Sequence, residues 1–420
     1  MAIEIETLEA VPLNEKSEAC QWANDGDELV NPVIESAEFA LKETDLVKIN
    51  PEGVRSAAQH VHERLISESY SPRTWRTHAL HLCPPEPYDP LSPQTRATLD
   101  WVFFISALNF SFWSEKEGTD ERYGVEWREG WGSEKRKVHT GYWSLVAAVD
   151  RALEDGIPIT DPTFYCSEML CPDDLIEEVF APAPQSTETV PLIRERIQVL
   201  REVGYILCES FGGSFQGLLE QFQRRHTGEG TALQLVQMVT ETFPSFRDET
   251  WLDGRRVFIW KRAQILVAET WAAFYPPSPL PSSAHPFFPK GIHQLTMFAD
   301  YRVPQILHHL RILTYPSSLT HILKMHTPLQ NGSREEVSIR AGSIVAVERV
   351  REEIERLVEE RRKSSLAKGN SEAEKERVSS VIIDFYLWDL AKRIESGNDR
   401  IEGTETDEIV PAHRTRSIWY

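Results

Sequence analysis

The sequence predicts a mainly α-helical fold. Apolar residues recur three and four positions apart in most segments, and runs of alternating polarity, which would indicate strands, are scarce. The segment RATLDWVFFISALNFSFWSE, residues 96–115, is apolar nearly all round yet too short to cross a bilayer, which favours a helix through the centre of a domain. A hydrophobic content of 41%, with 12 Trp and 18 Phe, supports a substantial core.

The helical segments follow from their spacing and from their start and stop signals. The segment PEGVRSAAQHVHERLISESY begins with Pro and Gly, and Gly156 ends another segment. The glycine cluster in FGGSFQGLLEQF follows no strand, so we interpret it as a tight turn between helices and not as a phosphate loop. The expected helices cover residues 36–47, 51–70, 96–115, 141–156, 171–180, 192–211, 230–243, 261–275, 303–313, 341–364 and 374–394.

The domain organisation follows from changes in composition. Residues 1–30 are acidic and poorly patterned, and we interpret them as a flexible tail. Residues 31–420 are expected to form a single large helical domain, with two poorly separated helical lobes as the alternative. Insertions are expected near residues 114–138, 275–291 and 363–376, the first of them as a small hairpin.

Charge and cysteine content limit the partners and the compartment. Forty-five basic and sixty-five acidic residues give a net charge of -20, so stable nucleic-acid binding is not expected and a small ligand or a protein is the better partner. The five cysteines form no CxxC pair, which favours reduced thiols. The start of the chain has no signal-peptide pattern and no apolar run reaches membrane-spanning length, so we expect a cytosolic or nucleocytoplasmic protein.

Familiar catalytic and metal motifs are absent from the sequence. There is no HExxH, GxSxG, Walker or dinucleotide pattern, so neither a metal nor a cofactor is expected. Cys166 and Cys171 have no base placed beside them, which argues against a nucleophilic thiol. Pairs of histidines without companion ligands at metal-binding spacing occur at His60/His62, His78/His81 and His308/His309.

The stretch TMFADYRVPQIL places a carboxylate at the start of a helix among aromatic side chains. Asp300 precedes Pro304, which is expected in the first turn, so Asp300 could simply cap the helix. Phe298 and Tyr301 flank it, and a helix dipole could keep such an acid ionised in an apolar surround. The pattern leaves a structural cap and a functional carboxylate equally open.

A second pair of carboxylates interrupts the apolar helix IIDFYLWDLAK. At about 100° per residue, Asp384 shares a face with Trp388, whereas Asp389 lies roughly 140° away from Asp384. Buried acids are costly unless they are paired. We therefore expect either core salt bridges, which the pattern favours slightly, or a site for a cationic ligand.

Basic residues that could bind an anion occur at two places. Lys261 and Arg262 begin a helix whose amide end could also hold an anion. The final segment PAHRTRSIWY has packed-looking aromatic residues, and we interpret it as a docked tail. Anion binding by Arg414 or Arg416 is the alternative.

Several long blocks together resemble one known family, the queuosine salvage proteins, or queuosine 5′-phosphate N-glycosylase/hydrolases. The resemblance extends from about Trp75 to Tyr420. The blocks that carry it, in chain order, are DWVFFISALNFSFWS, GYWSLVAAVDRALEDGIPIT, FGGSFQGLL, FPSFRDE, KRAQILVAETW, TMFADYRVPQIL, DFYLWDLA and HRTRSIWY.

The resemblance implies a helical fold similar to the helix-hairpin-helix DNA glycosylases. It also implies hydrolysis of the N-glycosidic bond of queuosine 5′-monophosphate to queuine, a 7-deazaguanine base, and ribose 5-phosphate. In the family pattern the FADYR block supplies the catalytic carboxylate and a phenylalanine of the base pocket, which fall on Asp300 and Phe298. Base-binding acids fall on Asp384 and Asp389, with Phe385 where the family has tyrosine.

The remaining site residues are less tightly matched to the family. A pocket histidine falls on His81, but the spacing after it is one residue shorter than in the family, so His78 is a rival. Trp388 is expected to contact the substrate, and its 5′-phosphate would suit Lys261, Arg262 or the terminal arginines. Two other functions stay open: a non-catalytic module that binds queuine or a tRNA-modifying partner, and a glycosylase that acts on a polymer.

Overall fold

The described part of the chain comprises residues 31–277, 285–367, 378–397, 401 and 404–420 of a computed structural model. The predicted tail, residues 1–30, lies outside these residues, as do parts of the predicted insertions near 275–291 and 363–376. Residues 31–420 form one compact unit.

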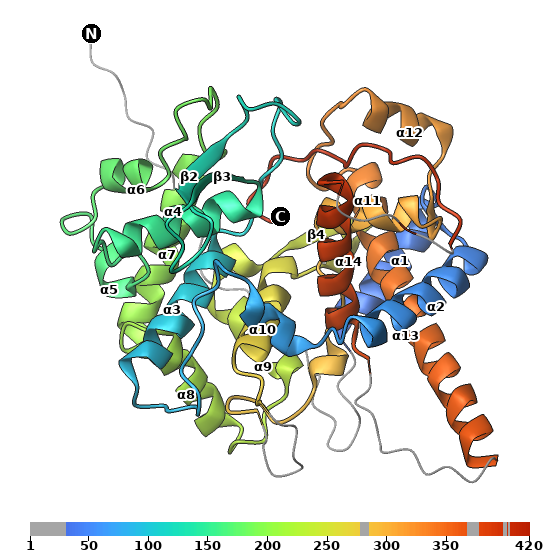
Figure 1. Cartoon of the computed structure of the whole chain (residues 1–420), viewed down its shortest axis with the longest axis horizontal. Coiled ribbons are helices and arrows are strands. Elements are labelled where there is room, and N and C mark those ends of the chain that lie inside the picture. The colour runs from blue at the N-terminus through green and yellow to red at the C-terminus, as the bar shows by residue number, and fades with distance from the viewer. Residues whose placement is uncertain (1–30, 278–284, 368–377, 398–400, 402–403) are drawn as a thin grey trace. The chain divides into compact units, whose positions relative to one another are not determined.

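Helices make up most of the described chain, as the sequence predicted (Figure 1). Three short 3-10 helices join them: η1 (Pro72–Thr77), η2 (Pro244–Phe246) and η3 (Ile292–Gln294). The α-helices are α1 (Pro32–Thr44), α2 (Pro51–Ser67), α3 (Pro93–Ala107), α4 (Tyr142–Glu154), α5 (Pro162–Tyr165), α6 (Asp173–Val179), α7 (Ile193–Phe211), α8 (Phe215–Arg225), α9 (Ala232–Thr242), α10 (Lys261–Ala273), α11 (Arg302–His309), α12 (Ser317–Lys324), α13 (Arg334–Ala367) and α14 (Ser380–Glu395).

Strands among the described residues form antiparallel pairs only. The pair β2 (Gly124–Arg128) and β3 (Arg136–Thr140) confirms the hairpin expected near residues 114–138. The pair β4 (Glu249–Leu252) and β5 (Arg255–Phe258) was not predicted, although the Asp-Gly turn between its strands is a known hairpin signal. The short strands β1 (Lys48–Ile49) and β6 (Leu313–Thr314) join distant parts of the chain.

Several helix bounds differ from the expected ones for local reasons. Helix α1 starts earlier than residue 36 because the Asn31 side chain accepts the backbone N–H of Val33, and it ends before Asp45, whose φ is 53°. Helix α14 begins at Ser380, where Ser379 caps it, and residues 374–377 of the expected helix lie outside the described residues. Helix α3 ends at Ala107, so the second half of the expected helix 96–115 is not helical. The segment FGGSFQGLLEQF is a turn only at its glycines, because α8 starts at Phe215. Helices α5, α8 and α12 were not predicted.

Helix α10 lies in the interior and contacts α3, α9 and η1, while α11 packs against α13 and α14. Helix α13 in turn contacts α1 and α2, and Figure 1 shows these helices on one side of α10 and helices α3 to α8 on the other. Nearly every residue of α10 is buried, including the charged Lys261, Arg262 and Glu269. Each of these buried charges therefore needs a partner within the fold.

A buried ion pair fixes the backbone just before Asp300. Arg340 on α13 donates to the Asp248 carboxylate, with an Nη1–Oδ1 distance of 3.0 Å, and to the carbonyl oxygen of Ala299 at 2.9 Å. Glu336, one turn earlier, also contacts the guanidinium at 3.3 Å. Since all three charged side chains are buried, this group couples α13 to the backbone that carries Asp300.

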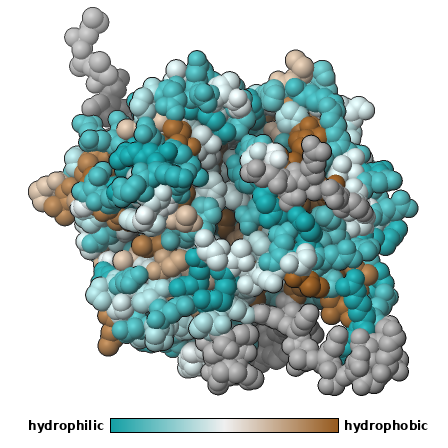
Figure 2. All heavy atoms as spheres, in the orientation of Figure 1, coloured by the Kyte–Doolittle hydropathy of each residue, from teal (hydrophilic) through white to brown (hydrophobic). Residues whose placement is uncertain are grey.

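The face drawn in Figure 2 is mostly hydrophilic, with hydrophobic residues in small separate groups. This agrees with the acidic, highly charged composition. No helix within the described ranges is both long and apolar enough to cross a bilayer.

Candidate active site

A cavity of about 430 Å³ lies between α4, α10, α14, η1 and the segment that precedes α11. Its volume falls within the range of roughly 300–1,000 Å³ that is usual for small-ligand pockets. All eight residues that the sequence proposed for the site line this cavity: His81, Lys261, Phe298, Asp300, Asp384, Phe385, Trp388 and Asp389. The rival His78 lines it too. Segments up to about 300 residues apart in the chain are thereby brought together.

Asp300 reaches the cavity from the start of α11. Its Oδ1 accepts the backbone N–H groups of Arg302 and Val303, each at 2.9 Å, which confirms that the side chain caps the helix. Pro304 lies in the first turn, as expected. The cap uses one carboxylate oxygen, so the side chain can cap α11 and still face the cavity, where it is partly exposed.

The protonation of Asp300 is set by opposing effects. Burial raises the pKa of its carboxyl above the usual value, while Lys261 and the two amide groups of α11 lower that pKa. Burial has the larger effect, so the pKa is raised overall. The helix start therefore favours the ionised form, as the sequence suggested, but it offsets only part of the cost of burial.

Lys261 lies beside this carboxylate at the start of α10. Its Nζ donates to both oxygens of Asn109, the backbone oxygen at 2.9 Å and Oδ1 at 3.1 Å. Burial lowers the pKa of the ammonium to about 8, and the charge of Asp300 acts in the opposite direction. Lys261 thus gives the carboxylates of the cavity a buried positive charge.

The two acids of α14 have polar partners that are not cations. Asp384 Oδ1 accepts the backbone N–H of Phe298 at 3.0 Å, and Asp389 Oδ2 accepts the Tyr70 hydroxyl at 2.6 Å. Neither forms an ion pair within the described part of the chain, so the slight preference for core salt bridges was wrong. Burial raises the pKa of both, and the nearby Asp300 raises that of Asp384 further.

Aromatic rings cover much of the cavity wall. Phe298 and Phe385 lie 5.9 Å apart between ring centroids, inclined by 53°. His78 stacks on Trp143 at 3.7 Å, and Trp143 meets Trp388 edge to face at 5.7 Å. Flat faces of this kind suit a planar heterocyclic ligand.

His81 presents one nitrogen without a partner. Its Nδ1 lies 2.6 Å from the carbonyl oxygen of Trp75, which can only accept, so Nδ1 carries the proton and Nε2 is an acceptor. Nε2 is buried and has no hydrogen-bond partner in the described part of the chain. Burial lowers the pKa of His81 to about 3, and that of His78 to about 4, so both rings are neutral near pH 7.

Glu269 on α10 is a cavity residue that the sequence reasoning missed. It accepts the Tyr142 hydroxyl at 3.3 Å, and the Ser106 hydroxyl lies 3.5 Å from its other oxygen. Burial raises the pKa of its carboxyl to about 7. The signal in the sequence is the same as for Asp384, an isolated acid in an apolar helical run, here VAETWAA.

The raised pKa of Glu269 predicts a pH-dependent stability. The folded state holds a proton that the unfolded chain, with a carboxyl pKa of 4.5, releases. Stability is therefore lost as pH rises from about 4.5 to about 7, by on the order of 3 kcal/mol. Between pH 5 and pH 8, denaturant unfolding should show a larger loss of the free energy of unfolding for the parent protein than for Glu269→Gln. Equal losses in the two proteins would contradict a raised pKa of Glu269.

The other arginines considered for anion binding are engaged elsewhere. Arg262 is buried and donates to the carbonyl oxygens of Ala107 and Ser245, so it is not part of the cavity wall. Arg416 donates to the carbonyl oxygen of Ser111, and its guanidinium lies 3.4 Å from the Trp113 ring centroid. Neither Arg262 nor Arg416 lines this cavity, so the structure does not support phosphate binding by either of them there.

The last residues of the sequence are packed against the fold. The backbone oxygen of Tyr420 accepts the N–H of Ser111 at 2.9 Å, and the Tyr420 ring lies 3.9 Å from the Arg340 guanidinium. Arg414 pairs with Glu115 at 3.2 Å. The docked tail expected from the sequence is confirmed.

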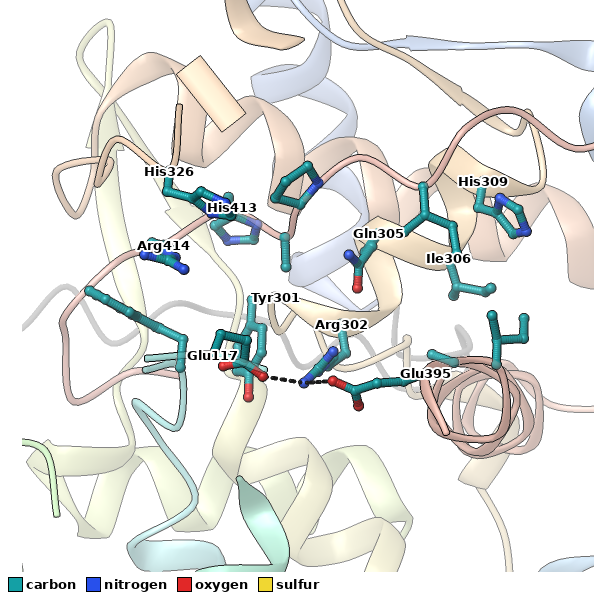
Figure 3. A pocket seen from close by; sticks show the side chains of 16 residues that line it. Glu117, Tyr301, Arg302, Gln305, Ile306, His309, His326, Glu395, His413 and Arg414 are labelled. Atoms are coloured by element: carbon teal, nitrogen blue, oxygen red, sulfur yellow. Dashed lines mark hydrogen bonds and ion pairs between the residues drawn. The ribbon is translucent and has the colours of Figure 1, made fainter. Parts of the chain in front are cut away.

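A second cavity, of about 210 Å³, shares the wall formed by Tyr301 and Arg302 (Figure 3). Arg302 lies between two carboxylates, with Nη2 2.9 Å from Glu395 and 3.4 Å from Glu117. Arg414 lines this smaller cavity and not the larger one. Within the described ranges, no group of His, Cys, Asp and Glu side chains is placed to hold a metal ion.

The fold and the cavity together define a mainly α-helical protein with an internal small-molecule site that combines carboxylates with aromatic walls. Comparison with known proteins gives the family: residues 89–420 match the queuosine salvage proteins, and the chain belongs to this family.

Relatives named queuosine 5′-phosphate N-glycosylase/hydrolase match almost the whole chain. The Schizosaccharomyces pombe protein is 37% identical over 396 residues, which cover 92% of this chain and 99% of the relative. The Mus musculus protein is 37% identical over 388 residues, covering 92% and 98%. The Sphaerobacter thermophilus protein is 32% identical over 398 residues, covering 95% and 100%.

Proposed function

We propose that this protein hydrolyses the N-glycosidic bond of queuosine 5′-monophosphate and releases queuine and ribose 5-phosphate. The relatives carry this activity in their names and align with nearly the full chain. The observation that carries the proposal is the meeting of Asp300, Asp384 and Asp389 with aromatic walls in one cavity of about 430 Å³.

Asp300 is the proposed catalytic carboxylate. As the base departs, C1′ of the ribose gains positive charge, so a fixed carboxylate binds the transition state better than the neutral ground state. This holds both for direct attack by water and for a route through a ribosyl ester. The cap on α11 supports this role because it fixes the orientation of the carboxyl group.

The aromatic wall and the acids of α14 are proposed to hold the base. Phe298 and Phe385 would flank the 7-deazaguanine ring, with Trp388 beside them. The queuine side chain carries a secondary ammonium, which can pair with Asp384 or Asp389. Their hydrogen-bond partners are the Phe298 amide and the Tyr70 hydroxyl, and neither acid forms an ion pair with a side chain of the described residues, which supports this pairing.

The departing base needs a hydrogen-bond donor because a 7-deazapurine lacks the ring nitrogen N7, which is often protonated when purine nucleosides are hydrolysed. Overall, water supplies a hydroxyl group to C1′ and a proton to the base. Glu269, whose burial raises its pKa to about 7, lines the cavity and can hold a proton near neutral pH. It is therefore a candidate donor for this step.

We also infer that residues 31–420 act as a single domain similar to the helix-hairpin-helix DNA glycosylases, and that the protein works in the cytosol or nucleocytoplasm. The mainly helical fold and the sequence blocks support the first inference. A net charge of -20 supports a mononucleotide substrate rather than a polymer.

The direct test compares three substrates: queuosine 5′-monophosphate, queuosine nucleoside and queuosine-containing tRNA. Chromatography should detect queuine released fastest from the monophosphate, slower from the nucleoside and not from tRNA. Tight binding of the monophosphate without release would favour the non-catalytic alternative. Release from tRNA with a steep dependence on salt would favour the glycosylase that acts on a polymer.

A further inference from the structure

Tyr420, the last residue of the sequence, lines the larger cavity but has no part in the chemistry proposed above. It is only 2% exposed. A tail that merely covered the surface of the fold would not reach the wall of the catalytic cavity. The contacts of Tyr420 therefore bear on how the site is held together.

The ring of Tyr420 lies over the guanidinium of Arg340, with 3.9 Å between the ring centroid and Cζ. A cation is attracted to an aromatic face, most strongly where both groups are shielded from water, as they are here. The same guanidinium donates to the carbonyl oxygen of Ala299 at 2.9 Å, directly before Asp300. The ring thus restrains the arginine that fixes the backbone of the proposed catalytic carboxylate.

The hydroxyl of Tyr420 contacts the same buried group. It donates to Glu336, which itself lies 3.3 Å from the Arg340 guanidinium, and it lies 3.1 Å from His413 Nε2. Burial raises the pKa of the Tyr420 hydroxyl well above its usual value, so the hydroxyl keeps its proton. Ring and hydroxyl together therefore hold both Arg340 and its carboxylate partner.

The backbone of Tyr420 supports a second charged group of the cavity. Its carbonyl oxygen accepts the N–H of Ser111 at 2.9 Å. Ser111 has a φ of 59°, in the left-handed region that residues other than glycine rarely adopt, so contacts must hold this turn. Two residues earlier, both oxygens of Asn109 accept the ammonium of Lys261. The bond to Tyr420 thus fixes the segment that orients Lys261.

Both series of contacts end at charges that act on each other, the Asp300 carboxylate and the Lys261 ammonium. Stabilisation of transition-state charge depends on groups that are already in place, and a displacement of about 1 Å can lower a rate about 100-fold. Tyr420 contacts both supporting segments. It is therefore placed to fix one of these charges relative to the other.

We propose that Tyr420 is a positioning residue for the release of queuine. Its ring holds Arg340 and, through the Ala299 carbonyl oxygen, the backbone before Asp300. Its own backbone oxygen holds the turn at Ser111. This inference rests on the proposed function and assigns the docked tail a part in it. No bond to Tyr420 forms or breaks in the reaction.

The test measures the single-turnover rate of queuine release from queuosine 5′-monophosphate with the full-length protein. Each rate is divided by the number of queuine-binding sites that calorimetry finds in the same sample, which removes differences in the amount of folded protein. Tyr420→Met fills most of the space but has no aromatic face, so it should lower this rate roughly 10-fold. Its dissociation constant for queuine should stay close to that of the parent, because the acids of α14 are left in place.

Tyr420→Phe keeps the aromatic face over Arg340 and should release queuine within about threefold of the parent rate. The double variant Arg340→Met/Tyr420→Met tests the route of the effect. If Tyr420 acts through Arg340, the second change should slow the first variant little further. Full multiplication of the two effects, or a Tyr420→Phe protein as slow as Tyr420→Met, would overturn the route through the ring.

Tyr123→Met is the matched control. Tyr123 is also a buried tyrosine, and its hydroxyl donates to the carbonyl oxygen of Phe180 at 2.9 Å, but it lines neither cavity. This variant should lose stability and yet release queuine at the parent rate for each binding site.

Three results would overturn the positioning role of Tyr420: a parent rate in Tyr420→Met, equal slowing in Tyr123→Met, or a Tyr420→Met protein that no longer binds queuine. In the last case the tyrosine would hold the fold and not the geometry of the site. A parent protein that binds queuine but releases none from the monophosphate would instead refute the proposed function.

Discussion

Asp300→Asn is expected to lower the rate of queuine release by on the order of 10³-fold, as seen when one group that stabilises transition-state charge is removed. The change removes the negative charge and keeps the shape. The Asn oxygen can still accept the amide groups of Arg302 and Val303, so the cap on α11 should survive. Single-turnover assays should show the loss in the rate, while calorimetry should still detect queuine binding.

Asp161→Asn separates loss of charge at a helix cap from loss of catalysis. Asp161 caps α5 by accepting the N–H of Thr163 at 2.8 Å, and it lies outside the cavity. This variant should release queuine at the parent rate. If Asp300→Asn binds queuine and also releases it at a rate within tenfold of the parent rate, another group must stabilise the transition state.

The sequence could predict the parts of the site that depend on local order. The position of Asp300 four residues before Pro304 indicated a capped helix start, and the cap is present. The spacing of Asp384 and Trp388 placed both on one helical face, and both line the cavity. These features need only a few consecutive residues, which is why they could be anticipated.

Contacts between distant segments could not be predicted in the same way. The partner of Asp384 is the backbone N–H of Phe298, which lies 86 positions earlier. No periodicity indicates such a contact, and the salt bridge expected instead is not formed. A backbone donor satisfies a buried acid as a cation would, so composition cannot distinguish the two.

The adjacent residues Lys261 and Arg262 show a second limit of prediction from the sequence. Consecutive side chains on a helix point about 100° apart, so two adjacent residues need not face the same cavity. Helix α10 is buried on all sides, and its apolar pattern therefore gave no face that identified the site. The orientation is set by neighbours, since Arg262 donates to the carbonyl oxygens of Ala107 and Ser245.

Arg340→Met is expected to lower the free energy of unfolding by about 3–5 kcal/mol, the usual loss when one member of a buried ion pair is removed. The change leaves Asp248 and Glu336 buried without their cation. It also removes the donor to the Ala299 carbonyl oxygen, next to Asp300. Denaturant unfolding should show the lower stability, and the surviving folded protein should release queuine more slowly, because the proposed catalytic carboxylate is less well fixed.

Arg356→Met provides the matched comparison on the same helix. Arg356 also pairs with two glutamates, Glu353 at 2.6 Å and Glu360 at 2.5 Å, but its side chain is 49% exposed. Exposed ion pairs contribute little because water and salt screen them, so its unfolding curve should overlay that of the parent. Equal losses of unfolding free energy in the two variants would mean that burial does not strengthen the contribution of Arg340 to stability. A loss of stability confined to Arg340→Met would show that the buried pair stabilises the fold, and slower queuine release in that variant alone would show that it holds Asp300 in place.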